Sequence, residues 1–129
     1  MSRLTDAFSN EREMTRCYAG ARMAIGLSCL VVPRLLTGWI GDDARRAGTK
    51  TVIRCFAARD LALGAGTLLA MADDAPVRRW LQAAAACDAA DAAASLLALG
   101  RIPTRKALTA MAAAVAGAAT GAHLASRVP

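Results

Sequence analysis

The chain has 129 residues, which is enough for one domain but not for two separate cores. Apolar residues make up 56% of it and aromatic residues only 4%, and alanine dominates the second half, so the composition favours helix and disfavours strand. The net charge of +6 would suggest nucleic acid as a partner of a soluble protein, but the basic residues lie mainly beside apolar stretches. We therefore expect an all-α fold, membrane lipids as partners and no nucleic acid.

Residues 1–16 form a polar N-terminal lead-in. Its basic and acidic residues are equal in number, and no small-x-small cleavage site follows, so we expect it to be retained rather than removed as a secretory signal. Asn10 and Glu13 have the spacing of a capping box, which predicts that the first helix begins near Asn10.

Four apolar stretches follow and form the expected membrane domain, residues 17–129. Each has roughly 17 to 21 residues, and about 20 helical residues cross a hydrocarbon core of about 30 Å. A soluble helix of this length would normally carry a polar face along its whole length. The prediction is a bundle of four transmembrane helices over residues 17–33, 52–72, 80–99 and 107–125.

A soluble alanine-rich bundle is the alternative. The third stretch favours it, because alanine is nearly neutral for insertion and the stretch carries two aspartates. The fourth stretch opposes it, since its long central run has no charged residue. On balance we expect a multi-pass protein of the bacterial inner membrane.

The connectors carry residues typical of a membrane boundary. Trp39 and Trp80 fall at predicted interfaces, where tryptophan anchors helices. Lys and Arg residues number seven in the first and third connectors and six on the other side. Because the positive-inside rule needs a larger difference, the orientation stays open.

The cysteines and the histidine carry no metal-site pattern. The four cysteines lack a CxxC pair, and we interpret them as buried free thiols that act as small apolar side chains. His123, near the end of the fourth stretch, is interpreted as an interfacial polar residue. We expect no metal and no cofactor.

An unusual set of charged residues lies within the apolar stretches. Such charges are costly in a bilayer unless they face inward and are paired. We expect Arg22 to bind Asp60, and the other two arginines to bind the aspartates of the third helix. The predicted intramembrane polar cluster is Arg22, Arg54, Arg59, Asp60, Asp88 and Asp91.

This cluster has two readings that are compatible. In the structural reading, ion pairs determine how four alanine-rich helices assemble. In the functional reading, the cluster is a hydrated pocket or proton relay in which one of the aspartates responds to protons.

Small residues predict where helices approach closely. Gly117 and Gly121 form a GxxxG motif, which we take as a helix-packing surface on the fourth helix, for self-association or for a partner. The expected assembly is a homo-oligomer or a larger membrane complex.

The pattern resembles a known group of proteins. Gly20, Arg22, Gly26 and Pro33 in the first hairpin are followed by Arg54-x4-Arg59-Asp60-x3-Gly64 and then by Asp88-x2-Asp91. From about Gly20 to Gly121 this resembles the DUF4267-like proteins, small four-helix integral membrane proteins of high-GC bacteria. The layout is similar, more distantly, to that of DoxX-like membrane proteins. The resemblance implies the topology and no particular activity.

Three classes of function remain. The first is an accessory or structural subunit of a membrane complex, suggested by the short loops and small-residue faces. The second is a small oligomeric transporter coupled to protons or cations, with an intramembrane aspartate as the responsive group. The third, an enzyme, ranks last because the sequence contains no nucleophile, metal set or cofactor motif, so we predict no catalytic residues.

Overall fold

The structure, a computed structural model, describes residues 2–36 and 46–128, with side chains from residue 10 onward. These residues are all-helical, in the order α1 (Ser2–Val31), the 3-10 helix η1 (Pro33–Leu36), α3 (Ala47–Ala72), α4 (Val77–Leu97) and α5 (Thr104–Arg127). The described residues contain no strand, and an isolated β-bridge joins Leu99 to Ile102 between α4 and α5. The predicted all-α fold with four long helices is confirmed.

The helices begin earlier than predicted. The start of the first helix near Asn10 is wrong, because α1 begins at Ser2 and includes most of the polar lead-in. No proline or glycine interrupts residues 2–16, so nothing in this segment breaks a helix. The last two helices start directly after Pro76 and Pro103, whose fixed φ suits the entry to a helix.

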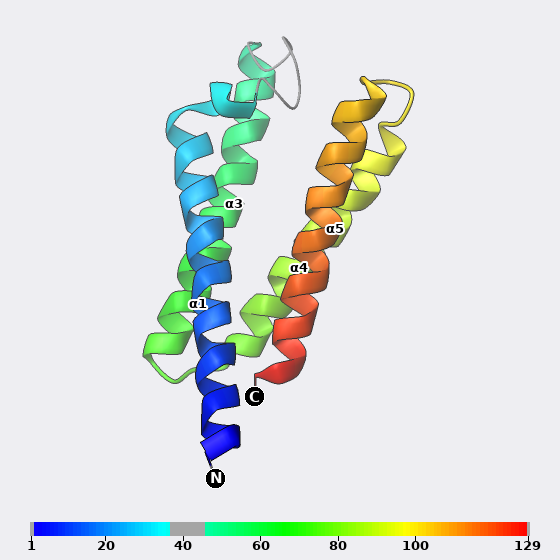
Figure 1. Cartoon of the computed structure of the whole chain (residues 1–129). Coiled ribbons are helices and arrows are strands. Elements are labelled where there is room, and N and C mark those ends of the chain that lie inside the picture. Colours follow the sequence, from blue (N-terminus) through cyan, green and yellow to red (C-terminus); the bar gives the residue numbers. More distant parts are fainter. Residues whose placement is uncertain (1, 37–45, 129) are drawn as a thin grey trace.

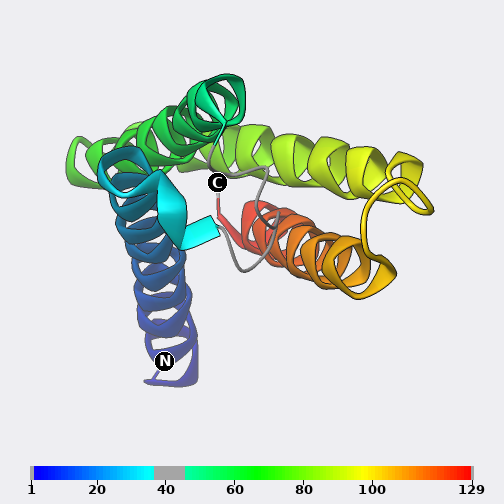
Figure 2. The ribbon, with the colours of Figure 1, turned by 90° about the horizontal axis from the view of Figure 1, so that it is seen from above.

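The helices form two antiparallel hairpins. In Figure 1, α1 lies beside α3 and α4 lies beside α5. The hairpins are close at the end that holds both chain termini and the α3–α4 turn, and they diverge toward the other end, as the view from above also shows (Figure 2). We call these the termini end and the η1 end. Contacts between hairpins are far sparser than those within them.

Small residues allow the first hairpin to pack closely. A Cβ atom added at Gly26 of α1 would lie 2.7 Å from the Ala57 carbonyl oxygen and 2.7 Å from the Leu61 nitrogen, both in α3. At Gly64 of α3, an added Cβ would lie 2.6 Å from the Ala19 carbonyl oxygen of α1. The two helix backbones are therefore in direct contact, which larger side chains would prevent.

Two apolar clusters stabilise the ends of the molecule. Cys29, Ile53 and Ala57 pack between α1 and α3 toward the η1 end. Leu81 and Leu124 join α4 to α5 toward the termini end, with Tyr18 of α1 packed against them. Between these clusters, the interior where the hairpins meet is polar.

Of the two predicted interfacial tryptophans, Trp39 lies outside the described residues. The ring of Trp80 in α4 packs on Gly66 of α3 and is 39% exposed. It is therefore a contact between the hairpins at the termini end as well as a partly exposed aromatic residue.

Candidate functional site

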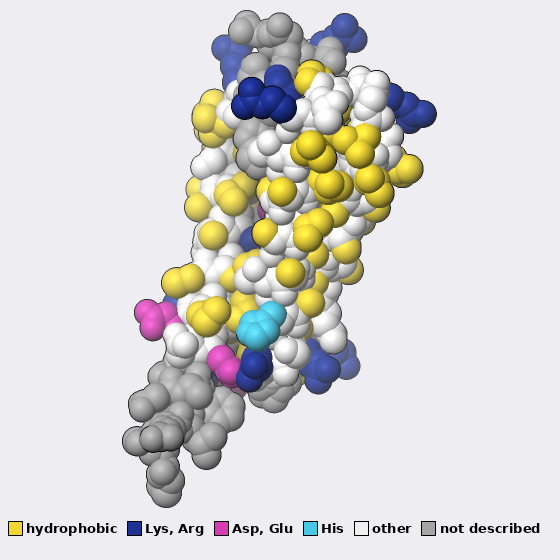
Figure 3. All heavy atoms as spheres, turned by 45° about the vertical axis from the view of Figure 1, so that its right-hand side comes forward, with side chains coloured by type: hydrophobic (Ala, Val, Ile, Leu, Met, Phe, Trp, Pro, Cys, Tyr) yellow, Lys and Arg dark blue, Asp and Glu magenta, His cyan; other side chains and the backbone are white. Residues whose placement is uncertain are grey.

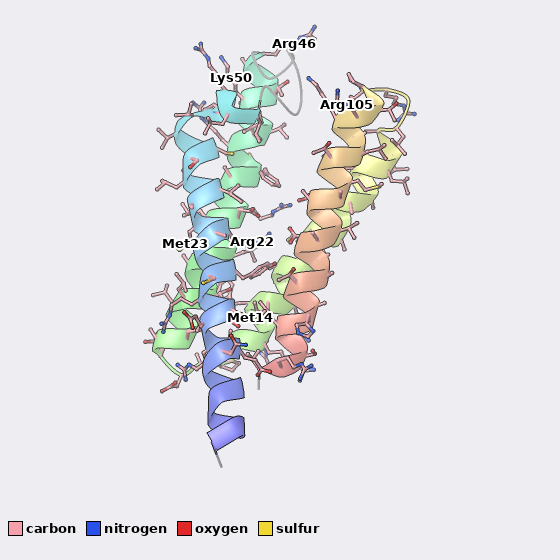
Figure 4. The ribbon with its side chains drawn as sticks, viewed as in Figure 1. Met14, Arg22, Met23, Arg46, Lys50 and Arg105 are labelled. Atoms are coloured by element: carbon pink, nitrogen blue, oxygen red, sulfur yellow. The ribbon has the colours of Figure 1, made fainter. Side chains whose placement is uncertain are left out.

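Arg22 lies in the middle of α1 and points toward the second hairpin (Figure 4). Its Nη1 and Nη2 donate hydrogen bonds of 2.6 and 2.8 Å to the two carboxylate oxygens of Asp88 in α4. Nη2 also donates a 2.9 Å bond to Oδ1 of Asp60 in α3. All three side chains are at least 90% buried. One guanidinium thus joins three helices by charge-assisted bonds.

A second ion pair lies beside the first. The Nη1 and Nη2 atoms of Arg59 in α3 donate bonds of 3.1 and 2.6 Å to the two oxygens of Asp91 in α4. Nη2 of Arg59 lies 3.5 Å from Oδ1 of Asp60. This pair is about one-third exposed, so it forms the accessible edge of the cluster. The guanidinium also lies over the ring of Phe56, 4.6 Å from its centroid.

These five residues, Arg22, Arg59, Asp60, Asp88 and Asp91, form the Arg–Asp network. It links α1 and α3 of the first hairpin to α4 of the second, halfway along the molecule. Two guanidinium groups face three carboxylates, so within the described residues the network carries one net negative charge when all are ionised. The Nε atoms of both arginines are buried and have no protein acceptor among the described residues.

Tyr18 completes the site and was not among the predicted residues. Arg22 Nη1 donates a 2.8 Å bond to its hydroxyl oxygen, and the hydroxyl contacts Asp88 Oδ2 at 3.4 Å and the Gly117 carbonyl oxygen at 3.3 Å. The Arg22 guanidinium lies 5.4 Å from the centroid of the Tyr18 ring. The spacing from Tyr18 to Arg22 is i to i+4, which places both on one face of α1 and is the signal that was available in the sequence.

The two glycines of α5 face this site. A Cβ atom added at Gly117 would lie 2.5 Å from Asp88 Oδ2, and one at Gly121 would lie 2.8 Å from the Tyr18 hydroxyl oxygen. Both glycines therefore pack against other helices of the same chain. Because they have no side chains, they leave space for Asp88 and Tyr18. They are therefore not available as the docking surface that the GxxxG motif predicted.

Five of the six predicted cluster residues come together, and Arg54 does not join them. Its Nε donates a 3.5 Å bond to the Leu30 carbonyl oxygen, and it lines a small surface pocket with Pro33 and Lys50 at the η1 end. Arg54 precedes Arg59 by five residues, which is about 7.5 Å along a helix. The predicted bond between Arg22 and Asp60 is present, whereas Asp88 is bound by Arg22 and not by an arginine of α3.

A cavity of about 390 Å³ lies at the termini end. Its charged lining residues form long ion pairs of 3.9 Å, Arg12 with Asp74 and Arg127 with Glu11. Leu81 and Leu124, both almost fully buried, pack with Tyr18 near this end. No residue of the network lines this cavity, and the Arg59–Asp91 pair is the most exposed part of the network.

The cysteines are free but not uniformly buried. Cys29 is buried, Cys87 is intermediate, and Cys17 and Cys55 are exposed, so the prediction of four buried thiols is wrong for the last two. Among the described residues, no group of three His, Cys, Asp or Glu side chains is placed to hold a metal ion. His123 is exposed near the end of α5.

Comparison with known proteins gives no further assignment: no family model, curated protein or solved structure matches the chain. The resemblance to DUF4267-like proteins stays a prediction.

Proposed function

We propose that the chain is a multi-pass protein of the bacterial inner membrane, in which all four helices span the bilayer. Its proposed role is that of an accessory, structural subunit of a membrane complex, with the Arg–Asp network holding its two hairpins in one arrangement. The partners would be membrane lipids and either further copies of the chain or other membrane subunits.

The distribution of charge on the outer surface supports this proposal most strongly. Over residues 17–31, 55–72, 80–99 and 107–126, no Asp, Glu, Lys or Arg is exposed. The charged side chains that the structure describes lie instead at the two ends of the molecule or in the network. Figure 3 shows apolar side chains over much of the face formed by α4 and α5, with Lys and Arg at both ends. A soluble domain of this size would carry charged residues along its exposed helix faces.

The lengths and composition of the helices add further support. α3 and α5, one in each hairpin, are long and apolar enough to cross a bilayer. The less apolar partners α1 and α4 carry Arg22, Asp88 and Asp91, whose charges are neutralised across the hairpins. Such pairing lowers the cost of placing α1 and α4 in hydrocarbon, so each hairpin can insert with its apolar helix.

Basic residues at the η1 end suit contact with lipid headgroups. Arg46, Lys50 and Arg105 all lie at this end (Figure 4), and Arg54 lines a pocket with Lys50. Among the side chains that the structure describes, this end carries seven Lys and Arg residues, Arg54 included, against five at the termini end. Anionic headgroups of the cytoplasmic leaflet attract such residues, so we propose that the η1 end faces the cytoplasm.

The membrane proposal is tested by placing a charge on the outer surface. Ala116 is exposed at the middle of α5, and Ser126 is exposed near its end. Arginine at the centre of a span costs about 2.5–3.5 kcal/mol of insertion free energy. We expect Ala116→Arg to reduce the amount of protein that resists alkaline extraction from membranes, and Ser126→Arg to leave it unchanged. A chain that stays soluble without detergent, and tolerates both changes equally, would contradict the proposal.

A proton-coupled transporter is the second candidate, favoured by the unbalanced charge of the network. Native mass spectrometry of tagged protein, purified in mild detergent, distinguishes the accessory subunit from the transporter. A protein partner in fixed stoichiometry supports the accessory subunit. A homo-oligomer that retains a small molecule supports the transporter and makes the network its binding site.

A further inference from the structure

The cavity at the termini end is lined by charged side chains of both signs. Glu11 and Arg12 come from α1, Asp74 from the turn between α3 and α4, and Arg127 from the end of α5. When all four are ionised, they carry no net charge. The lining therefore suits a ligand that itself carries both signs better than it suits a simple anion or a simple cation.

These four charged side chains are only loosely paired with one another. Arg12 Nη2 lies 3.9 Å from Asp74 Oδ1, and Arg127 Nη1 lies 3.9 Å from Glu11 Oε1. Both separations exceed the length of about 2.7–2.9 Å that is typical of a charge-assisted hydrogen bond. Arg12 also donates a 3.4 Å bond to the Met71 carbonyl oxygen. The charged groups of a ligand can therefore form shorter bonds to these side chains than the side chains form with each other.

Apolar residues form most of the remaining lining. They are Ala70, Met71, Ala75, Val77 and Val128. The volume of about 390 Å³ falls within the range of roughly 300–1,000 Å³ that is usual for small-ligand sites. Lining residues 11–15 precede the first proposed span and residues 127–128 follow the last, so in a membrane the cavity would lie at the level of the lipid headgroups. A charged headgroup attached to apolar chains matches such a lining.

The lining also distinguishes between two kinds of ligand cation. Aromatic rings recognise a quaternary ammonium, and no aromatic residue among the described ones lines the cavity. A primary ammonium instead offers three N–H donors, for which the carboxylates of Glu11 and Asp74 are strong acceptors. For the anionic group, the guanidinium groups of Arg12 and Arg127 suit phosphate.

We propose that this cavity binds the headgroup of a zwitterionic phospholipid that carries a primary ammonium. Its phosphate would bind Arg12 and Arg127, and its ammonium would bind Glu11 and Asp74. The bound lipid would then contact both hairpins at the end where they are close. The proposal rests on the proposed membrane function, because a protein in the bilayer meets such lipids at this level, and it adds which lipid is bound and where.

Native mass spectrometry of delipidated protein in mild detergent tests the choice of headgroup. The protein is mixed with equal amounts of phosphatidylethanolamine and phosphatidylcholine that have the same acyl chains. The two lipids have the same net charge and differ in whether the ammonium can donate hydrogen bonds. We expect bound phosphatidylethanolamine to exceed bound phosphatidylcholine by about tenfold, which corresponds to one hydrogen bond to a charged group. Equal binding of the two lipids would overturn the proposal.

Variants of the carboxylates locate the bound lipid. Glu11→Gln and Asp74→Asn each remove one charge with little change in shape, and asparagine tolerates the positive φ of 50° at residue 74. Each variant should bring the binding of the two lipids closer to equality. Asp73→Asn and Arg78→Gln remove exposed charges that do not line the cavity, so they should leave the preference unchanged. A preference that persists in both carboxylate variants, or that falls equally in the two controls, would place the lipid elsewhere.

Glycerophosphoethanolamine, which has the same headgroup without acyl chains, distinguishes a lipid from a free zwitterion. At a concentration equal to that of the lipid, we expect it to leave phosphatidylethanolamine bound, and displacement would overturn the assignment to a lipid. Alkaline extraction tests the membrane location separately. A membrane-embedded protein that binds both lipids equally contradicts only the headgroup site, whereas a soluble protein that prefers phosphatidylethanolamine contradicts only the location.

Discussion

The contacts within the hairpins differ in kind from the polar contact that the Arg–Asp network makes between them. Inside the first hairpin, glycine and alanine bring two backbones together, as at Gly26 against Ala57 and Gly64 against Ala19. Inside the second, Ala84, Ala107 and Gly121 are buried. Between the hairpins, Arg22 and Arg59 form bonds of defined length and direction to three aspartates.

The proposed membrane location accounts for this difference. Apolar contact alone gives little preference for one helix arrangement over another in a bilayer, so close helices need either small residues or polar bonds. Small residues suffice within a hairpin, because a short connector already keeps its helices together. The hairpins diverge toward the η1 end (Figure 1), and the Arg–Asp network joins them halfway along the molecule.

Replacing Arg22 should cause the largest loss of stability, because it breaks the polar contact between the hairpins. Arg22→Ala leaves the buried Asp60 and Asp88 without their shared cation, and breaking a buried pair costs about 3–5 kcal/mol. We expect a loss of this size in the free energy of unfolding, measured by titrating the protein in mixed micelles with a denaturing detergent. Arg54→Ala is the matched control, since Arg54 is exposed and lies outside the network, and it should cost little. Equal losses in the two variants would show that the network does not stabilise the junction.

Composition and apolar patterning were enough to predict the fold class and the number of helices. The helix starts were less accurate, because a polar segment such as residues 1–16 continues a helix as readily as it precedes one. Five network residues were predicted from the cost of charge in apolar stretches. Their pairing was only partly correct, because sequence spacing does not give the rotation of α1 relative to α4.

The role of Tyr18 was missed because it, too, depends on how the helices are placed relative to one another. An aromatic residue beside an apolar stretch resembles an ordinary core or interface residue, and its hydroxyl acquires partners only when three helices converge. The inward position of Gly117 also depends on that convergence. For such tertiary contacts the sequence offers only a faint local signal, here the i to i+4 spacing of Tyr18 and Arg22.

Enlarging a glycine within a hairpin should have the next largest effect. In Gly26→Ala the new methyl group would lie 2.7 Å from two backbone atoms of α3, so the helices must move apart. Overpacking of this kind costs about 1–3 kcal/mol of unfolding free energy. Gly20→Ala is the control, since an added Cβ there meets nothing within 4 Å.

The same detergent titration measures both glycine variants. If Gly20→Ala destabilises the protein as much as Gly26→Ala, the loss reflects glycine itself and not close contact between α1 and α3. Because Gly26 lies four residues from Arg22 on α1 and contacts Ala57 and Leu61, which flank Asp60, its effect should couple to that of Arg22→Ala in the double variant.

Tyr18→Phe should have the smallest effect and separates the hydroxyl from the ring. The change removes the bonds to Arg22, Asp88 and Gly117 while keeping the packing against Leu81 and Leu124. The net contribution of such bonds is about 0.5–1.5 kcal/mol, and we expect a loss of that size. If the hydroxyl acts by orienting Arg22, the loss should nearly vanish when Tyr18→Phe is made together with Arg22→Ala, a double-mutant cycle that isolates their coupling. An undiminished loss would instead assign the hydroxyl to the contact with α5, through the Gly117 carbonyl, and would mean that α1 and α5 hold the two hairpins together independently of the charges.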